Sequence, residues 1–431
     1  MTSRFFDCSV PDCARPSARS VGAGCDICCK HFCGVHMLPN FHKCGSTNTT
    51  QPTTRFSWPT DRLRAQINDE AVCELASSLN DGRACTIEYS SKIAGSGSLM
   101  GCANYHARIR FDDDVSWLMR VPRVTGYAVG LPVSLAEYLI RSEYVTLKFL
   151  ETSTTVPAPR AFWFGIPSEG TDRGVGVCFL LMEELPGRPW DGGGDKTRVW
   201  KGLAEIYAEL ERRRFTRAGS LYVESPEDDV LPLREVSAAA SDRFVGIKPY
   251  GPFETAAAYY RGWVEKYLAL IVDGQMYPQF PVEAYLVYRF LRDEASRQLS
   301  DFEDGDGDEK ELFLKHVDDK GDHLLVDGDS NIIGIIDCQM ARVVPRREAF
   351  AVSLVTADMR ELCDGNVSIS ADDVALSDAL REKGSASGLL ASYRGDEKVR
   401  RLFWGLGLEP KWVYALPLAK AILKVFRVEQ G

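Results

Sequence analysis

The chain lacks three features that would assign it to broad classes of protein. Its 431 residues contain no apolar run approaching the roughly 20 residues that span a bilayer. The opening residues, MTSRFFD, lack the apolar segment of a secretory signal peptide. Positive charge is not in excess, because 51 Lys and Arg stand against 61 Asp and Glu, for a formal net charge of −10. We therefore expect a cytoplasmic protein, with the nucleus as the alternative, and neither a membrane nor a nucleic-acid partner.

Cysteine is abundant but unevenly distributed. Seven of the 13 cysteines and three of the six histidines fall within the first 44 residues. The first 50 residues also carry five Lys and Arg against three Asp and Glu, so the net acidity belongs to the remainder. With 45% hydrophobic and 10% aromatic residues, that remainder is able to form a large core. Two unlike modules are expected.

The cysteine-rich module carries enough ligands for two zinc ions. Disulfides do not persist in a reducing compartment, whereas structural zinc sites use four thiolates or imidazoles supplied as closely spaced pairs. The ligand pairs are, in order, Cys8 and Cys13, Cys25 and Cys28, Cys33 and His36, and His42 and Cys44. In a cross-braced arrangement the first and third pairs share one ion, and the second and fourth share the other. The alternatives are incidental thiols, or a single metal held by part of the set with Cys29 or His31 as substitutes.

The run from Phe32 to Cys44, FCGVHMLPNFHKC, resembles the AN-1-type zinc finger over about residues 8 to 44. That resemblance implies recognition of a protein partner, in relatives linked to ubiquitin, the proteasome or chaperones, with no catalysis by the metal.

Beyond the finger, the pattern of apolar residues indicates a tether, a β-rich segment and then a helical one. Residues 45 to 58 are polar and Thr-rich, as in a flexible linker, and a four-residue apolar repeat predicts a helix over 60–79. Alternating residues predict strands over 85–93, 105–111 and 116–121, and a continuous apolar run predicts a buried strand over 177–182. A helix is predicted over 134–150, and helical spacing dominates after residue 187, except for a strand pair over 324–326 and 332–336. The expected units are 1-50 (finger), 51-84 (linker and helix), 85-185 (β-rich lobe) and 186-431 (helical lobe).

Two aspartates around the second strand pair suggest phosphoryl transfer. This chemistry needs one carboxylate near the acceptor hydroxyl and another that holds magnesium on the phosphates. His316-x-Asp318 is the candidate catalytic loop, with Asp318 as the base, and Asp337 at the end of an apolar strand is the candidate magnesium ligand. The alternative is a surface hairpin in which Asp serves the turns.

Upstream residues occur in the order that a kinase requires. Gly95 and Gly97 lie in a loop between strands where a phosphate-covering loop is expected. Arg120 occupies the strand position where a kinase carries its phosphate-pairing lysine, and a guanidinium is able to contact phosphate there without being equivalent to an ammonium. Glu143 in the next helix is the expected ion-pair partner of Arg120, with Glu137 as the competitor. Glu183 begins the connection between the two lobes.

Several phrases carry a family resemblance. They are WLMRVP (117–122), SEYVTLKFL (142–150), VPAP (156–159), LMEELPG (181–187), FTRAGSL (215–221) and the Asp318 to Asp327 loop with Ile336-Asp337. Residues from about 85 to 431 thus resemble the aminoglycoside phosphotransferase family, particularly its fungal branch. The resemblance implies an α+β, two-lobed, protein-kinase-like fold, ATP with magnesium as cofactors, and adenine bound near residues 183 to 185. It also implies the roles given above for Asp318, Asp337, Arg120 and Glu143.

The chain departs from the family pattern close to the candidate site. Relatives commonly carry an Asn five residues after the catalytic Asp, whereas this chain has His323, and Cys338 and Gln339 replace a common Trp and an acidic residue. Magnesium prefers oxygen ligands to an imidazole, and the neighbouring Asp322 is the alternative to His323 as a second ligand. The leading hypothesis is an ATP- and magnesium-dependent phosphotransferase that acts on a hydroxyl of an unknown small molecule, joined to a zinc-binding protein-recognition finger. The alternative is a non-catalytic kinase-like scaffold in ubiquitin or stress pathways.

Overall fold

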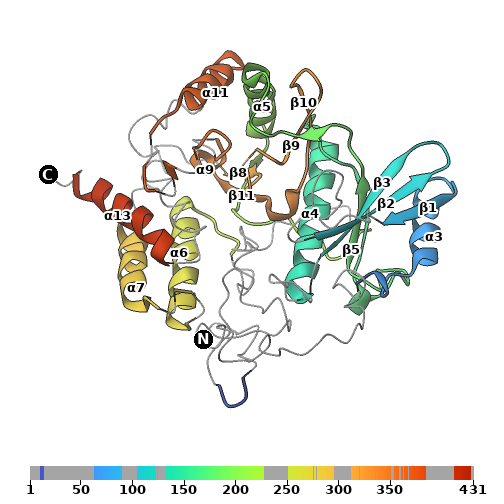
Figure 1. Cartoon of the computed structure of the whole chain (residues 1–431), viewed down its shortest axis with the longest axis horizontal. Helices are drawn as coiled ribbons and strands as arrows, with labels where there is room; N and C mark the ends of the chain where they lie inside the picture. The colour runs from blue at the N-terminus through green and yellow to red at the C-terminus, as the bar shows by residue number, and fades with distance from the viewer. Residues whose placement is uncertain are drawn as a thin grey trace, which may run out of the picture.

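The structure is a computed structural model of the whole chain (Figure 1). It describes residues 10–13, 63–89, 104–122, 124, 133–227, 251–274, 276–277, 279–295, 312–319, 321–350, 354–358, 361–362, 364–366, 368–384 and 412–428. No helix within these ranges is both long and apolar enough to cross a membrane.

An antiparallel five-stranded sheet forms one lobe, with strand order β1-β2-β3-β5-β4. The strands are β1 (Cys85–Tyr89), β2 (Asn104–Phe111), β3 (Ser116–Pro122), β4 (Ala161–Gly165) and β5 (Phe179–Glu183). Because side chains alternate along a strand, one face of β2 and β3 is apolar, with Ile109 and Met119 fully buried. Helix α3 (Asp69–Leu79) covers this face through Val72 and Ala76, and Asn68 caps its first turn.

Helix α4 (Val133–Ser153) lies between this sheet and the second lobe (Figure 1). It contacts β4 and β5 on one side and the short 3-10 helix η3 (Cys338–Met340) on the other. Most of its residues between 135 and 150 are buried, including the charged Arg141 and Glu143. Side chains of α4 therefore contact both the sheet lobe and the segment that follows the second strand pair.

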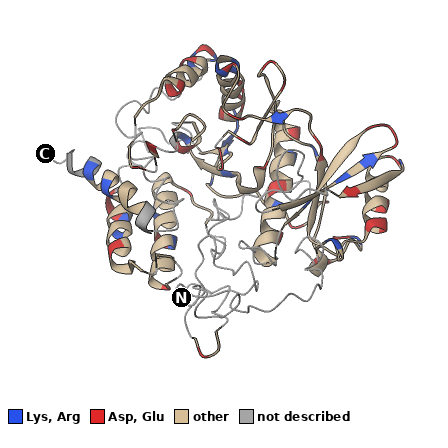
Figure 2. Ribbon diagram, in the orientation of Figure 1, with Lys and Arg blue, Asp and Glu red and all other residues tan. Residues whose placement is uncertain are grey.

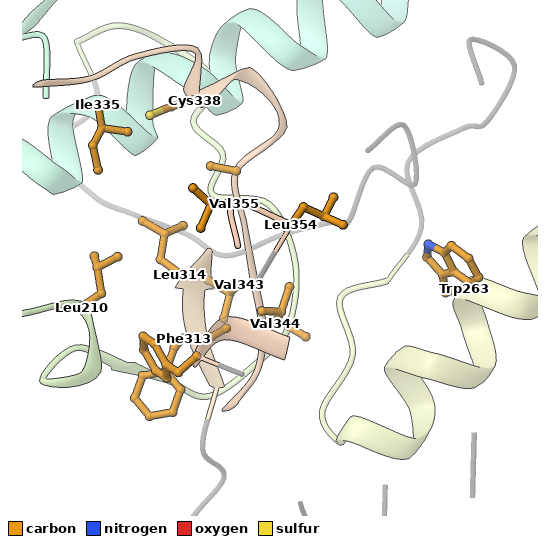
Figure 3. Close-up of a cluster of buried hydrophobic side chains, with 14 of the residues drawn as sticks. Leu210, Trp263, Phe313, Leu314, Ile335, Cys338, Val343, Val344, Leu354 and Val355 are labelled. Atoms are coloured by element: carbon orange, nitrogen blue, oxygen red, sulfur yellow. The ribbon is translucent and has the colours of Figure 1, made fainter. Parts of the chain in front are cut away.

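Two small antiparallel sheets lie beside α4, with strand orders β10-β9-β6 and β11-β8-β7. Their strands are β6 (Arg188–Pro189), β7 (Arg214–Phe215), β8 (Leu312–Lys315), β9 (Leu324–Val326), β10 (Ile332–Ile335) and β11 (Arg342–Pro345). Strand β8 leads directly into the segment of Asp318, and β10 leads directly to Asp337. Figure 3 shows apolar side chains of these strands, among them Phe313, Leu314 and Val343, in one buried cluster with Cys338.

Helices complete the second lobe. They are α5 (Lys196–Glu211), α6 (Ala256–Val272), α7 (Pro281–Phe290) with the π-turn η2 (Leu291–Ala295), α9 (Arg346–Phe350), α11 (Ala371–Glu382) and α13 (Trp412–Val428); a 3-10 turn, η1 (Pro167–Glu169), follows β4. Helix α11 packs on α5, and α6 packs on α7. Acidic and basic residues are mixed along the described helices and strands (Figure 2).

The expected kinase-like α+β fold, with a β-sheet lobe and a helical lobe, agrees with this architecture. Strands predicted over 105–111, 116–121 and 324–336 are present, and the helix predicted over 134–150 extends to 133–153. The helix predicted over 60–79 is interrupted in the structure, because residues 63–64 are helical, residues 65–68 are not, and α3 begins at Asp69. Strands β4, β8 and β11 were not predicted. The finger and its zinc ligands lie outside the described residues, apart from Cys13.

Candidate active site

The face of the sheet opposite α3 carries a row of polar side chains. On β2 this row consists of Asn104, His106, Arg108 and Arg110, at every second residue. Each contacts a different element: Asn104 contacts Gln339 of η3, His106 contacts Arg120 of β3, Arg108 contacts Glu184 after β5, and Arg110 contacts Glu88 of β1. The row therefore runs from the neighbourhood of Asp337 to the connection between the lobes.

Arg120 joins three elements at the centre of the site. Its Nη1 donates to both carboxylate oxygens of Glu143, at 2.6 and 2.8 Å, and to Oδ1 of Asp337 at 2.9 Å. The side chains of Arg120 and Glu143 are 5% and 1% exposed, whereas that of Asp337 is 49% exposed. Glu143, and not Glu137, is thus the carboxylate that pairs with Arg120. The side chains of β3, α4 and the β10 terminus meet at one guanidinium.

The charges of this cluster shift one another's protonation. Burial by itself would raise the pKa of Asp337, but the positive charge of Arg120, the nearby imidazoles of His316 and His106 and the hydrogen bond from Arg120 lower it overall. Burial raises the pKa of Glu143 to about 7, since the loss of hydration outweighs the attraction of Arg120 and the nearby Asp337 adds repulsion. Burial opposes the charge of Arg120, yet the two carboxylates raise its pKa. Asp337 is therefore ionised and half-exposed at neutral pH.

The backbone at Asp337 is unusual. Its φ of 65° and ψ of 46° lie in the left-handed region, which few residues other than Gly, Asn and Asp adopt. The next residue, Cys338, is buried in the apolar core, and its backbone N–H donates to Glu143. Such a turn at the end of β10 directs the Asp337 carboxylate toward Arg120 while the chain re-enters the core.

The segment of Asp318 is bound to the segment of Asp337 at two points. A ring nitrogen of His316, Nε2, lies 2.9 Å from the carbonyl oxygen of Ile336, and the N–H of Ile336 donates to the carbonyl of His323 at 2.9 Å. The half-buried Asp318 lies between these two histidines in the chain. These contacts hold the two segments that carry the candidate aspartates beside each other.

His323 has a packing role in the described loop. Its ring stacks on that of His316, with 4.2 Å between centroids and 16° between planes, and its Nδ1 accepts a hydrogen bond from the N–H of Gly321. Its side chain is buried. The residue that replaces the usual Asn thus supports His316, which in turn contacts the residue before Asp337.

A buried charged network lies behind the Asp318 loop. The ammonium of Lys315, at the end of β8, donates to the carbonyl of Glu348 at 2.6 Å and lies 3.7 Å from the carboxylate of Asp319. Arg342, paired with Lys315 across β8 and β11, lies 3.7 Å from Glu348. Because buried charges need partners, this network fixes the strand from which the loop departs.

The connection between the lobes is held by Glu183 and Glu184. Glu184 accepts from Nε of Arg108 at 2.7 Å and from Ser116 at 2.5 Å, and these bonds lower its pKa against the effect of burial. The side chain of Glu183 accepts from the N–H of Arg160, and its own N–H donates to the carbonyl of Arg160. Glu183 is therefore bonded to the residue that precedes β4, and the N–H of Glu184 donates to the carbonyl of Ser116.

Of the residues predicted from sequence, the structure brings Arg120, Glu143 and Asp337 into contact and puts Asp318 on an adjoining segment. Gly95 and Gly97 lie outside the described residues, as do the predicted zinc ligands other than Cys13. In the described part of the chain, no group of three or more His, Cys, Asp or Glu side chains is placed to hold a metal ion. Magnesium in phosphoryl transfer is bound through one or two carboxylates together with substrate phosphates.

Sequence reasoning missed His106, Lys315 and the buried amide pair of Asn104 and Gln339. The two amides are 4% and 3% exposed, and among the described residues Oδ1 of Asn104 and Nε2 of Gln339 have no hydrogen-bond partner. The alternation of β2 could have revealed His106, because the short turn after Phe111 sets His106 opposite Arg120. Lys315 and Gln339 carry no signal of this kind, since their partners depend on tertiary packing.

Structural comparison finds similar chains among solved phosphotransferases. The macrolide 2'-phosphotransferase MphH from Brachybacterium faecium is 18% identical, with a TM-score of 0.41 and coverage of 82% of this chain and 97% of that one. Aminoglycoside phosphotransferase APH(4)-Ia, solved with ADP and hygromycin B, is 12% identical, with a TM-score of 0.43 and coverage of 84% and 99%. Ethanolamine kinase from Plasmodium vivax is 10% identical, with a TM-score of 0.43 and coverage of 76% and 80%. No curated protein matches the sequence.

The family model described as "Phosphotransferase enzyme family" matches residues 132–367, which is more than half of the chain. That segment includes Glu143, Asp318 and Asp337, while Arg120 precedes it. The match, and not the distant structural similarities, carries the assignment: the chain belongs to the phosphotransferase enzyme family.

Proposed function

We propose that this protein is an ATP- and magnesium-dependent phosphotransferase that acts on a hydroxyl group of a small molecule. The observation that carries the proposal is the contact of Arg120 with both Glu143 and Asp337. One base thereby connects the sheet, the helix α4 and the end of β10, which is the arrangement that phosphoryl transfer needs for a nucleotide. Family membership supports the same class of reaction.

The donor set suits a nucleotide with magnesium. Asp337 offers an ionised, half-exposed carboxylate, and magnesium prefers carboxylate oxygen. Magnesium, when bound, neutralises charge on the phosphate oxygens. Arg120 would contact the phosphates while Glu143 holds its guanidinium from behind. The loop that contains Gly95 and Gly97 would cover the phosphates, and the backbone near Glu183 would contact the adenine.

Asp318 is the proposed catalytic base. Its loop is fixed to the Asp337 segment through His316 and Ile336, so a hydroxyl held by Asp318 would lie next to the phosphates bound at Asp337. A carboxylate in this role accepts or orients the hydroxyl proton as the oxygen attacks the terminal phosphorus. The packed His323 leaves Asp337 as the principal carboxylate for the metal.

Thermal melting followed by phosphate transfer tests the proposal. A saturating ligand at a hundred times its dissociation constant stabilises a protein by about 2.7 kcal/mol, so Mg·ATP should raise Tm measurably. Purified protein incubated with γ-labelled ATP and a panel of metabolite hydroxyls should label one acceptor class. Asp318→Asn should abolish this labelling while the Tm shift remains. A wild-type protein without a Tm shift would instead indicate the non-catalytic scaffold.

We propose further that residues 1-50 form a two-zinc finger that recognises a protein, joined by residues 51-84 to lobes at 85-185 and 186-431. Support comes from the donor set of six cysteines and two histidines in the sequence. A segment this short buries too little apolar surface to fold alone, so the metal would supply its stability. The resemblance to ubiquitin- and chaperone-linked fingers and the fungal branch of the family belong to the same proposal, as does a cytoplasmic location.

A further inference from the structure

Arg120 uses only part of its hydrogen-bonding capacity on carboxylates. A guanidinium has five N–H donors in a rigid plane. The Nη1 group contacts Glu143 and Asp337, and Nε donates to Nε2 of His106 at 3.2 Å. Within the described residues, Nη2 has no hydrogen-bond partner. The Nη2 group is therefore the part of the guanidinium that is available to a ligand.

His106 is placed for this contact by strand pairing. It lies directly opposite Arg120 in the register of β2 and β3, on the face of the sheet that carries the site. Directly opposite residues of an antiparallel pair bring their side chains within about 5 Å of each other. In this contact Nε2 of His106 is the acceptor and Nε of Arg120 is the donor.

The contact depends on the arginine. A lysine has a single terminal nitrogen, and its stem has no donor at the position of Nε. If Arg120 were held only through the bonds of Nη1 to Glu143 and Asp337, its guanidinium plane could rotate about Nη1. The bond from Nε to His106 is a second point of attachment on another edge, and two points fix the orientation of a plane that one point leaves free.

We propose that His106 is a positioning residue that orients the Arg120 guanidinium so that its Nη2 edge faces the nucleotide phosphates. His106 and Arg120 then act as a matched pair that performs the task of a single lysine. This inference rests on the proposed function, because it assumes that a triphosphate occupies the site. It adds a residue on β2 that no motif of the sequence marks.

Calorimetric titration of the full-length protein with Mg·ATP and, separately, with adenosine tests the pair. His106→Ala should weaken Mg·ATP about tenfold, the order of one charge-assisted hydrogen bond, and leave adenosine affinity unchanged. His106→Gln, whose amide oxygen reaches the position of Nε2, should recover most of the loss. His106→Asn, whose oxygen is too short to reach Arg120, should not. Arg83→Ala, at an exposed arginine that pairs with Asp113 outside the polar row of β2, is the control and should bind like wild type.

A double-mutant cycle supplies the second readout. Arg120→Lys should weaken Mg·ATP, and adding His106→Ala to Arg120→Lys should change the affinity by less than about twofold. If His106→Ala and His106→Asn bind Mg·ATP as tightly as wild type, or if the cycle is additive, the positioning role is wrong while the proposed function stands. If wild-type protein binds no Mg·ATP, the proposed function falls and takes this inference with it. The Gln and Asn variants keep a polar side chain at residue 106, so the comparison does not depend on the fold tolerating Ala.

Discussion

Arg120 places a planar, permanently charged guanidinium in a buried position, and the neighbouring side chains accept its hydrogen bonds. Glu143 and Asp337 accept hydrogen bonds from Nη1 of Arg120, and His106 accepts one from Nε. A buried charge with a missing partner is costly, so each of these residues contributes to keeping Arg120 in place. The cluster explains why an arginine at this strand position does not by itself argue against nucleotide binding.

The protonation of Glu143 gives a prediction about pH and stability. Since burial raises its pKa to about 7 from 4.5, its contribution to stability is complete below about pH 4.5 and is lost as pH rises through 7. Glu143→Gln does not titrate. The free energy of unfolding of wild type minus that of Glu143→Gln should therefore fall by about 3 kcal/mol between pH 4.5 and 7.5.

Urea unfolding of both proteins at closely spaced pH values measures this difference. A difference that rises with pH would mean that the attraction of Arg120 outweighs the loss of hydration at Glu143, contrary to the assignment made here.

At the scale of elements, sequence patterns predicted those strands whose side chains alternate clearly. Strands β2 and β3 alternate over seven or eight residues, so their existence followed from the pattern. Strands β4, β8 and β11 are only four or five residues long and almost wholly buried, and such short apolar runs look the same in a strand and in a helix. The strand that carries Lys315 into the Asp318 loop was missed for this reason.

The candidate site could be predicted as far as the order of residues along the chain was enough to locate it. The order of Arg120, Glu143, Asp318 and Asp337 along the chain suggested the site, and the contacts of Arg120 agree with it. The choice of Glu143 over Glu137 needed the orientation of α4, which periodicity alone did not give. The partnership of Asn104 with Gln339 joins residues 235 positions apart, and no local pattern encodes it.

The packing of β4 on β5 gives a prediction at this scale. A Cβ at Gly165 would overlap the ring of Phe179 and lie 2.7 Å from the Cα of Asp172, where the backbone cannot yield easily. Gly165→Ala should therefore cost about 3 kcal/mol of unfolding free energy through overpacking. Gly328→Ala is the matched control, because nothing lies within 4 Å of its added Cβ.

Denaturant unfolding of the two variants provides the check. We expect Gly328→Ala to differ from wild type by no more than about 0.5 kcal/mol. Equal stabilities for both variants would contradict the close approach of β4 and β5 described here.

At the scale of the whole molecule, the proposed phosphotransferase lobes follow a cysteine-rich segment of different composition. Metal analysis of the purified full-length chain should give two zinc ions per molecule if both proposed sites exist. Cys25→Ser removes a ligand of one proposed site and should reduce the content to one, whereas Cys73→Ser, in α3, should leave it at two. One zinc or none in wild type would refute the cross-braced finger.

Removal of zinc by a chelator tests whether the two modules depend on each other. Chelation of zinc should unfold the finger but leave Mg·ATP binding unchanged, because none of the residues assigned to the nucleotide site lies before Gly95. Loss of nucleotide binding together with zinc would show that the assignment of the site to the lobes alone is incomplete.

Asp337 and Arg120 are proposed to bind the metal-complexed phosphates of ATP. Calorimetric titration of Mg·ATP into wild type and Asp337→Asn measures it most directly, because Asn tolerates the left-handed backbone of residue 337 and retains its size. We predict saturable binding by wild type and at least about tenfold weaker binding by Asp337→Asn, as expected for loss of a charged metal ligand, with adenosine affinity unchanged. Equal Mg·ATP affinities for the two proteins, or no binding by wild type, would contradict the claim.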